Sequence, residues 1–200
     1  MFYGIMLEKG GYMETEITVQ VFNSFKETDK ILKGQGFKLV EEFQLNDWYF
    51  SHIKNAKNAA YARLLKNSFL LREVIGDSHT FKLCYKNKEI NRKGDVIGEQ
   101  KTSAKIEDFD KTLKIFTQSG LNNWCVLKNH SYAYEKDNIR FSLQVIEDLG
   151  IFIEYEEDDF MKEMRTNEKI EFMKNVVSSL GLKLGNDFSC KKVYMKLHSK

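Results

Sequence analysis

The sequence predicts an α+β fold built on one antiparallel sheet of about eight strands, closed into a barrel or strongly curved, with helices flanking it. Three observations predict this fold. Runs rich in β-branched and aromatic residues recur along the chain and alternate polar with apolar side chains, as strands do. Amphipathic helical patterns that end at glycine interrupt these runs. The first of these patterns returns near the middle of the chain, which indicates that two similar halves build the sheet.

The first half begins with a strand and a helix. The run over 14–22 alternates like a strand, and Ser24 with Glu27 forms the capping box that starts a helix. That helix ends at Gly34 or Gly36, because glycine is favoured just after a helix. The next predicted elements are a strand over 37–51, a helix over 53–67, and strands over 69–75 and 80–88.

The second half repeats this order. The stretch "FDKTLKIFTQSGL" at 109–121 matches "FKETDKILKGQGF" at 25–37, at an offset of 84 residues. Short amphipathic helices also match by chance, so the repeat alone leaves the two halves a hypothesis. The remaining predicted elements are strands over 124–136, 138–147 and 150–157, a helix over 159–180 that stops at Gly181, and either a strand or a short helix over 191–197.

The stretch "EKGGYM" indicates where translation begins. Lys-Gly-Gly can be encoded by a ribosome-binding sequence, which would lie a few bases before the codon for Met13. We therefore expect the protein to begin at Met13 and residues 1–12 to be an upstream extension.

Composition narrows the classes of protein. The 200 residues are 42% hydrophobic and 30% charged, which is enough for a core and argues against disorder. Positive and negative charges are interspersed around a net charge of +2 without a long basic run, and we expect no nucleic-acid partner. No apolar run approaches the roughly 18 residues of a membrane span. The three cysteines lack zinc-ligand spacing, as in a reduced, cytoplasmic protein.

Two strands from opposite ends of the chain carry paired glutamates. Glu14 and Glu16 share a face in "METEITVQ", and Glu154 and Glu156 share a face in "FIEYEED". One such pair is typical of a solvated strand face. Two pairs favour carboxylates gathered around a cation, and hard oxygen ligands suit Mg²⁺ or Mn²⁺. The solvated face stays open as the alternative.

Basic residues line the faces of other predicted strands. Lys82 and Lys86 share a face, Arg140 shares one with Ser142 and Gln144, and Arg72 lies on "LLREV". Three more side chains in phase on the strand over 124–136 are Lys128, His130 and Tyr132. If these faces point into one lumen, bases would neutralise phosphate oxygens while carboxylates hold metal, as a polyphosphate requires. An outer sheet face with solvated charges is the other interpretation.

At this point the chain resembles the CYTH family, the group of class IV adenylate cyclases and thiamine triphosphatases also called triphosphate tunnel metalloenzymes. The resemblance lies in "ETEITVQV", "NDWYF", "LCYK", "KIEDFD" and above all "LQVIEDLGIFIEYE". It covers about residues 13–156 and extends towards 197. It implies one CYTH-like domain over 13–197, built of two pseudo-symmetric halves around an eight-stranded barrel whose tunnel binds triphosphate.

The resemblance also implies site residues and a reaction. Carried over by motif, Glu14 and Glu16 are catalytic acids, and together with Glu154 and Glu156 they bind Mg²⁺ or Mn²⁺. The resemblance implies that Lys86 contacts phosphate, and it matches Lys128 and Arg140 more loosely. With the bases of the strand faces, the expected substrate-binding residues are Arg72, Lys82, Lys86, Lys128 and Arg140. The implied substrate is ATP, thiamine triphosphate or tripolyphosphate, used by an adenylate cyclase or a phosphohydrolase. The resemblance further allows a homodimer.

The chain departs from the family pattern at several polar positions. Thr18 and Gln20 stand where lysine is frequent, and Gln144 stands where the family has aspartate. Each lost charge-assisted contact weakens anion binding by about 1.5–3 kcal/mol. A degenerate, non-catalytic protein that binds a nucleotide or polyphosphate is therefore the alternative function.

Overall fold

The computed structural model describes residues 13–199, so the expected upstream extension over residues 1–12 lies outside the described residues. Its strands are β1 (Glu16–Val21), β2 (Lys38–Ser51), β3 (Asn67–Ile75), β4 (His79–Ile90), β5 (Val96–Ile106), β6 (Asn122–Lys136), β7 (Ile139–Ile146) and β8 (Gly150–Glu156). Its α-helices are α1 (Phe25–Gly34), α2 (Tyr61–Leu65), α3 (Phe109–Gln118), α4 (Thr166–Ser178) and α5 (Lys192–His198).

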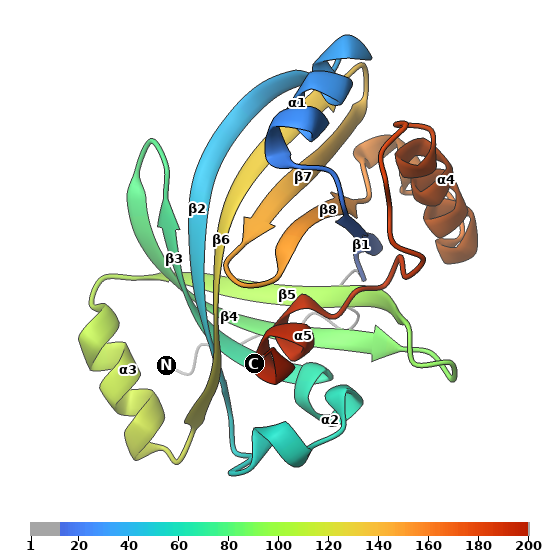
Figure 1. Cartoon of the computed structure of the whole chain (residues 1–200). Helices are drawn as coiled ribbons and strands as arrows, with labels where there is room; N and C mark the ends of the chain where they lie inside the picture. Colours follow the sequence, from blue (N-terminus) through green and yellow to red (C-terminus); the bar gives the residue numbers. More distant parts are fainter. Residues whose placement is uncertain (1–12, 200) are drawn as a thin grey trace, which may run out of the picture.

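The strands form one curled antiparallel sheet of eight strands, which confirms the predicted fold class. Their order is β1-β8-β7-β6-β2-β3-β4-β5, with the long strands β2 and β6 side by side in the middle. Figure 1 shows the sheet bending so that its two ends approach each other. The ends meet where the backbone groups of Glu14 and Glu99 exchange two hydrogen bonds of 2.9 Å.

The apolar faces of β1, β7 and β8 point outward, because helices cover the outside of the curled sheet. Val19, Leu143 and Ile153 are fully buried in one cluster with Leu32 of α1 and Met173 of α4. Burial of these side chains is the main favourable term in placing the helices. Since strand side chains alternate, the polar residues between them face the concave interior.

A C-terminal segment over 183–190 covers the free edge of β1. Thr18 donates its backbone N–H to the carbonyl of Phe188 at 3.0 Å and accepts the N–H of Cys190 at 3.0 Å. The N–H of Gly185 bonds the carbonyl of Gln20 at 2.9 Å. This edge pairing leads the chain directly into α5, which lies below the open end of the sheet in Figure 1.

The two halves of the chain have equivalent topology. If each of β1–β4 is exchanged with its counterpart in β5–β8, so that β1 becomes β5 and β2 becomes β6, the sheet has the same strand order read from its other end. Helices α1 and α3 begin 84 residues apart, and the glycine two residues after the C-terminal residue of each has a positive φ, +90° at Gly36 and +79° at Gly120. This arrangement is the one expected for pseudo-symmetric halves.

Two predicted helices differ from the structure, and one strand was missed. The helix expected over 53–67 is a 3₁₀ turn (Ala56–Asn58) and the short helix α2. The helix expected over 159–180 is a 3₁₀ turn (Asp159–Met161) followed by α4, which begins only at Thr166. Arg165 precedes it in an extended conformation, and its backbone N–H bonds the Glu168 carboxylate. Strand β5 has no alternating pattern and was not predicted, and the ambiguous 191–197 segment is the helix α5.

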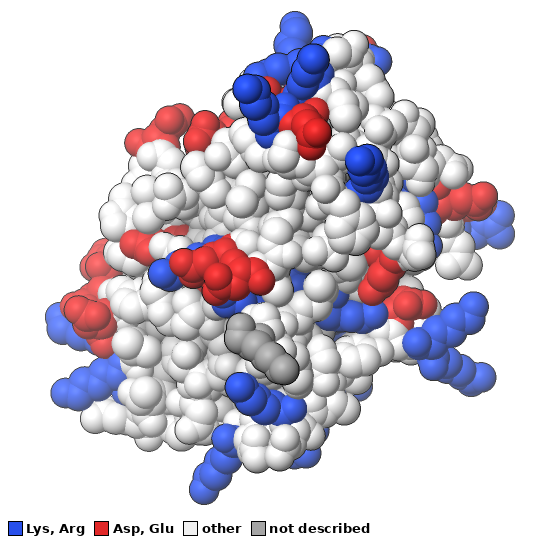
Figure 2. All heavy atoms as spheres, in the orientation of Figure 1, with Lys and Arg blue, Asp and Glu red and all other residues white. Residues whose placement is uncertain are grey.

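Surface charge is mixed. On the face drawn in Figure 2, lysine and arginine side chains are interspersed with aspartate and glutamate.

No helix in the described part of the chain is both long and apolar enough to cross a membrane.

Candidate functional site

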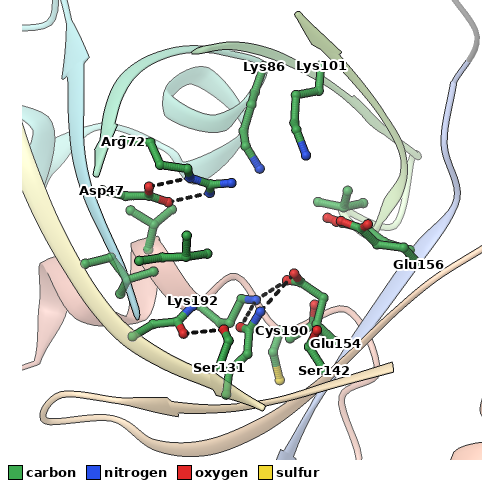
Figure 3. A pocket seen from close by; sticks show the side chains of 18 of the residues that line it. Asp47, Arg72, Lys86, Lys101, Ser131, Ser142, Glu154, Glu156, Cys190 and Lys192 are labelled. Atoms are coloured by element: carbon green, nitrogen blue, oxygen red, sulfur yellow. Dashed lines mark hydrogen bonds and ion pairs between the residues drawn. The ribbon is translucent and has the colours of Figure 1, made fainter. Parts of the chain in front are cut away.

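The concave face of the sheet encloses a cavity of about 490 Å³. Side chains from all eight strands and from the start of α5 line it. Figure 3 shows Glu156 on one side of this cavity, Glu154 beside Lys192, Lys86 and Lys101 together on another side, and Arg72 with Asp47 on a third. The lining is therefore charged on an inward face, and the alternative of outward, solvated strand faces is wrong for these residues.

Three glutamates form the acidic side of the cavity. Glu16 lies opposite Glu156 in the β1–β8 register, and Glu154 lies two residues before Glu156 on the same face of β8. One carboxylate oxygen from each residue lies within 4.8 Å of those of the other two. Burial and the nearby charge of Glu154 raise the pKa of Glu156. A cation between the three carboxylates would relieve this repulsion, so the donor set fits a hard divalent ion.

Lysines of β4 face this acidic side. Lys88 Nζ lies 2.6 Å from Glu16 Oε1 and 2.5 Å from Glu99 Oε2, and Lys86 Nζ lies 2.7 Å from Glu99 Oε1. Burial opposes the charged form of Glu99, but the two lysines outweigh it and hold the pKa of Glu99 well below its usual range. Lys101 enters the cavity from the adjacent strand β5, opposite Lys86 in the register.

An arginine is fixed on another wall of the cavity. Arg72 donates from Nε to Asp47 Oδ1 at 2.7 Å and from Nη2 to Asp47 Oδ2 at 2.6 Å, which links β3 to β2. Burial disfavours the charged form of Arg72, but the Asp47 carboxylate more than offsets it and raises the pKa of Arg72. Lys82 lies opposite Arg72 in the β3–β4 register and also lines the cavity. Asp47 thus orients the guanidinium in this polar wall.

The last charged group comes from α5. Lys192 forms an ion pair with Glu154 and donates to Gln144 Oε1 at 2.6 Å, while Gln144 Nε2 donates to Glu154 Oε1 at 3.0 Å (Figure 3). Burial raises the pKa of Glu154, but the charge of Lys192 outweighs this and lowers it. The acidic side is therefore closed by a residue far from it in sequence.

The structure gathers most of the residues singled out in the sequence. Those that line the cavity are Glu16, Arg72, Lys82, Lys86, Arg140, Glu154 and Glu156. Glu14 does not line it; its side chain is exposed, before the start of β1.

The inward face predicted for the strand over 124–136 was wrong. Lys128 is exposed, 3.8 Å from Glu147, and does not line the cavity. The inward positions are Leu127, Asn129 and Ser131. Both faces of this strand mix polar and apolar residues, so alternation alone does not reveal which face is inside.

The lining residues that the sequence analysis missed include Asp47, Lys88, Lys101 and Lys192. Lys88 continues the face of Lys82 and Lys86, so the period of two could have found it. Lys101 lies on the unpredicted strand β5, and Asp47 needs its cross-strand partner to be recognised. Lys192 carries no local signal, because only the tertiary path of the C-terminal segment brings it to Glu154.

Comparisons with known proteins agree with this geometry. No family model matches the chain. A curated Methanocaldococcus jannaschii protein, named as a putative adenylate cyclase, is 25% identical over 186 residues, which are 92% of this chain and 98% of that protein. This full-length relative agrees with the resemblance to the CYTH family that the ordered glutamate motifs indicate.

Solved structures share the CYTH-like fold. A Pyrococcus horikoshii protein is 18% identical with a TM-score of 0.68, covering 92% of this chain and 97% of that one. A Hippeastrum protein, described as a putative adenylyl cyclase with a dominant triphosphatase activity, is 11% identical with a TM-score of 0.58, covering 94% and 100%. In this chain the first and last sheet motifs are neighbours in space, since β1 pairs with β8.

Proposed function

We propose that this CYTH-like protein is a divalent-metal-dependent enzyme that acts on the triphosphate group of a small molecule. The observation that carries the proposal is the meeting of three carboxylates with a set of bases in one cavity. A triphosphate needs many positive contacts, and a metal ion that bridges its oxygens needs oxygen ligands from the protein. Both are available on facing walls of this cavity.

The residues divide the work by charge. Glu16, Glu154 and Glu156 would hold Mg²⁺ or Mn²⁺, whose chemistry is polarisation of phosphoryl oxygens and offset of developing negative charge. Lys86, Lys88 and Lys101 of β4 and β5 lie where they can bind phosphate oxygens opposite those acids. The bases on the remaining walls are Arg72, Lys82 and Arg140. Glu14 and Lys128 are left out of the proposed site because they do not line the cavity.

Two reactions fit this binding mode. In hydrolysis, a water attacks the terminal phosphorus and inorganic phosphate leaves. In cyclisation, the ribose 3′-hydroxyl of ATP attacks the α-phosphorus and pyrophosphate leaves. The name of the Methanocaldococcus relative supports cyclisation, and the description of the Hippeastrum protein supports hydrolysis. We propose an adenylate cyclase-like or phosphohydrolase reaction, in a cytoplasmic protein without a nucleic-acid or membrane partner.

Phosphorus NMR tests the reaction directly. The purified chain is mixed with Mg²⁺ or Mn²⁺ and with ATP, thiamine triphosphate or tripolyphosphate. Cyclic AMP with pyrophosphate would establish a cyclase, and inorganic phosphate would establish a hydrolase. A parallel sample with a chelator should show no product. Product formation that persists in the chelated sample would contradict metal dependence.

A non-catalytic binder is the second candidate. Two of the three clustered glutamates already contact a lysine, since Lys88 pairs with Glu16 and Lys192 pairs with Glu154. Gln144 stands at the position where the family resemblance expects an aspartate. Under this alternative the same spectra show shifted or broadened triphosphate resonances and no product, with or without metal.

A further inference from the structure

Lys192 is held at the acidic side of the cavity by two oxygen atoms that accept hydrogen bonds from its ammonium. Its Nζ forms an ion pair with Glu154 of β8, and its side chain is largely buried, at 13% exposure. The amide oxygen of Gln144 on β7 lies 2.6 Å from the same Nζ. Figure 3 shows the Lys192 ammonium beside the Glu154 carboxylate. Oxygens from two neighbouring strands thus surround one positive charge.

The backbone around Lys192 is anchored on both sides. Before it, the N–H of Cys190 bonds the carbonyl of Thr18 on β1 at 3.0 Å. After it, Val193 and Leu197 are buried. The fold therefore fixes the position of the Lys192 ammonium in the site.

The local charges balance around this ammonium. Glu154 contributes one negative charge, the Gln144 amide contributes none, and Lys192 contributes one positive charge. Lys86 and Lys88 balance Glu16 and Glu99 in the same way. With Glu156 this leaves a net charge of about −1 on the acidic side, so one divalent ion would bring it to about +1 and two would bring it to about +3.

We infer that Lys192 takes the place that a second divalent ion would need beside Glu154, so that the acidic side holds one metal ion per chain. Two-metal phosphoryl-transfer sites keep their ions about 3.5–4 Å apart, and both ions balance charge on the reacting oxygens. Here the Lys192 ammonium, which is part of the chain, supplies one of these positive charges. The inference rests on the proposed function only in requiring that a divalent ion binds.

Counting bound Mn²⁺ tests the inference without any turnover. Electron paramagnetic resonance of the free aquo ion gives the number of Mn²⁺ ions bound per chain during a titration of the substrate-free protein. We expect one ion for the wild type, one for Lys192→Arg, which keeps the charge, and two for Lys192→Met. Lys196→Met is the matched control, because this lysine lies on the same helix but pairs with Asp148 outside the cavity lining. It should bind one ion.

A wild-type count of two overturns the inference, and so does a Lys192→Met protein that still binds one ion at any affinity. Circular dichroism establishes that each variant is folded. If Lys192→Met does not fold, the wild-type and Lys192→Arg counts still decide, since two ions in either contradicts the inference. An inactive protein that binds one ion refutes the proposed reaction alone. Absence of binding in every protein refutes both.

Discussion

Single residues in this cavity differ in role although their types are the same. Glu14 and Glu16 lie two apart in one sequence motif, yet Glu16 joins the acidic cluster and Glu14 is exposed outside the lining. Lys101 and Lys128 are both exposed lysines on strands, yet only Lys101 lines the cavity. In each pair the two residues have the same chemistry but different positions, so the residue outside the cavity is the control for the residue inside it.

The first prediction concerns the two N-terminal glutamates. Glu16→Gln should weaken Mn²⁺ binding at least about 10-fold, because it removes one of three converging carboxylates. Glu14→Gln makes the same chemical change outside the cavity and should leave the affinity unchanged. The measurement is the same Mn²⁺ titration. Equal loss in both variants would show that Glu14 also binds the ion and that the acidic cluster is larger than the three residues.

The second prediction concerns the two exposed lysines. Lys101→Met should weaken binding of tripolyphosphate by about 1.5 kcal/mol, which is roughly a 10-fold rise in Kd, because a charge-assisted contact is lost. Lys128→Met should leave Kd unchanged. Isothermal titration calorimetry at one fixed salt concentration measures both. A larger effect at Lys128 would place the anion on the outer face of the sheet.

At the scale of elements, the sheet is held together by charges as well as by its core. The Asp47–Arg72 pair joins β2 to β3 with both side chains largely buried, at 6% and 16% exposure. The pair between Lys128 and Glu147 is more than half exposed on both sides. Only the buried pair has given up its hydration, so loss of one partner there leaves a charge without compensation.

The third prediction follows from that difference. Asp47→Ala should lower the free energy of unfolding by about 3 kcal/mol, because Arg72 stays buried without its carboxylate. Glu147→Ala should change it by less than about 1 kcal/mol, as is usual for exposed pairs. Urea denaturation of the metal-free proteins measures both. If the two variants lose the same stability, water in the cavity already solvates Arg72.

The elements also differ in how well they could be predicted from the sequence. Strands such as β2 and β7 alternate over many residues and could be located closely from the sequence. Strand β5 could not, because its inward and outward positions are both polar over much of its length. Glu16, Glu154 and Glu156 could be found because they lie on strongly alternating strands, whereas Glu14 lies before β1 and outside the cavity lining. Lys192 could not, because its place depends on the path of the segment over 183–190 along β1.

At the scale of the whole molecule, the two halves use the same packing positions. Three buried pairs lie 84 residues apart: Leu32 with Phe116, Phe37 with Leu121, and Phe50 with Tyr134. In each half a helix packs its face onto the outside of the sheet, and a glycine with positive φ then turns the chain into the long central strand. We therefore expect the stability of the protein to depend on both turns to a similar extent.

The fourth prediction tests that equivalence. Gly36→Ala and Gly120→Ala should each destabilise the protein by about 1 kcal/mol, because φ values of +90° and +79° disfavour any residue with a Cβ. Neither site is crowded, since the nearest atom to an added Cβ is 3.7 Å away at Gly36 and beyond 4 Å at Gly120. The loss would therefore come from the backbone conformation alone.

Gly34→Ala is the control for both variants. Gly34 is the C-terminal residue of α1, lacks a positive φ and has no neighbour within 4 Å of an added Cβ, so alanine there should stabilise the protein by up to about 1 kcal/mol. Thermal unfolding monitored by circular dichroism ranks the three variants. Equal losses at Gly36 and Gly120 with a gain at Gly34 support two equivalent turns. A loss confined to one of the two would mean that the halves share topology but not their energetic dependence on the turn.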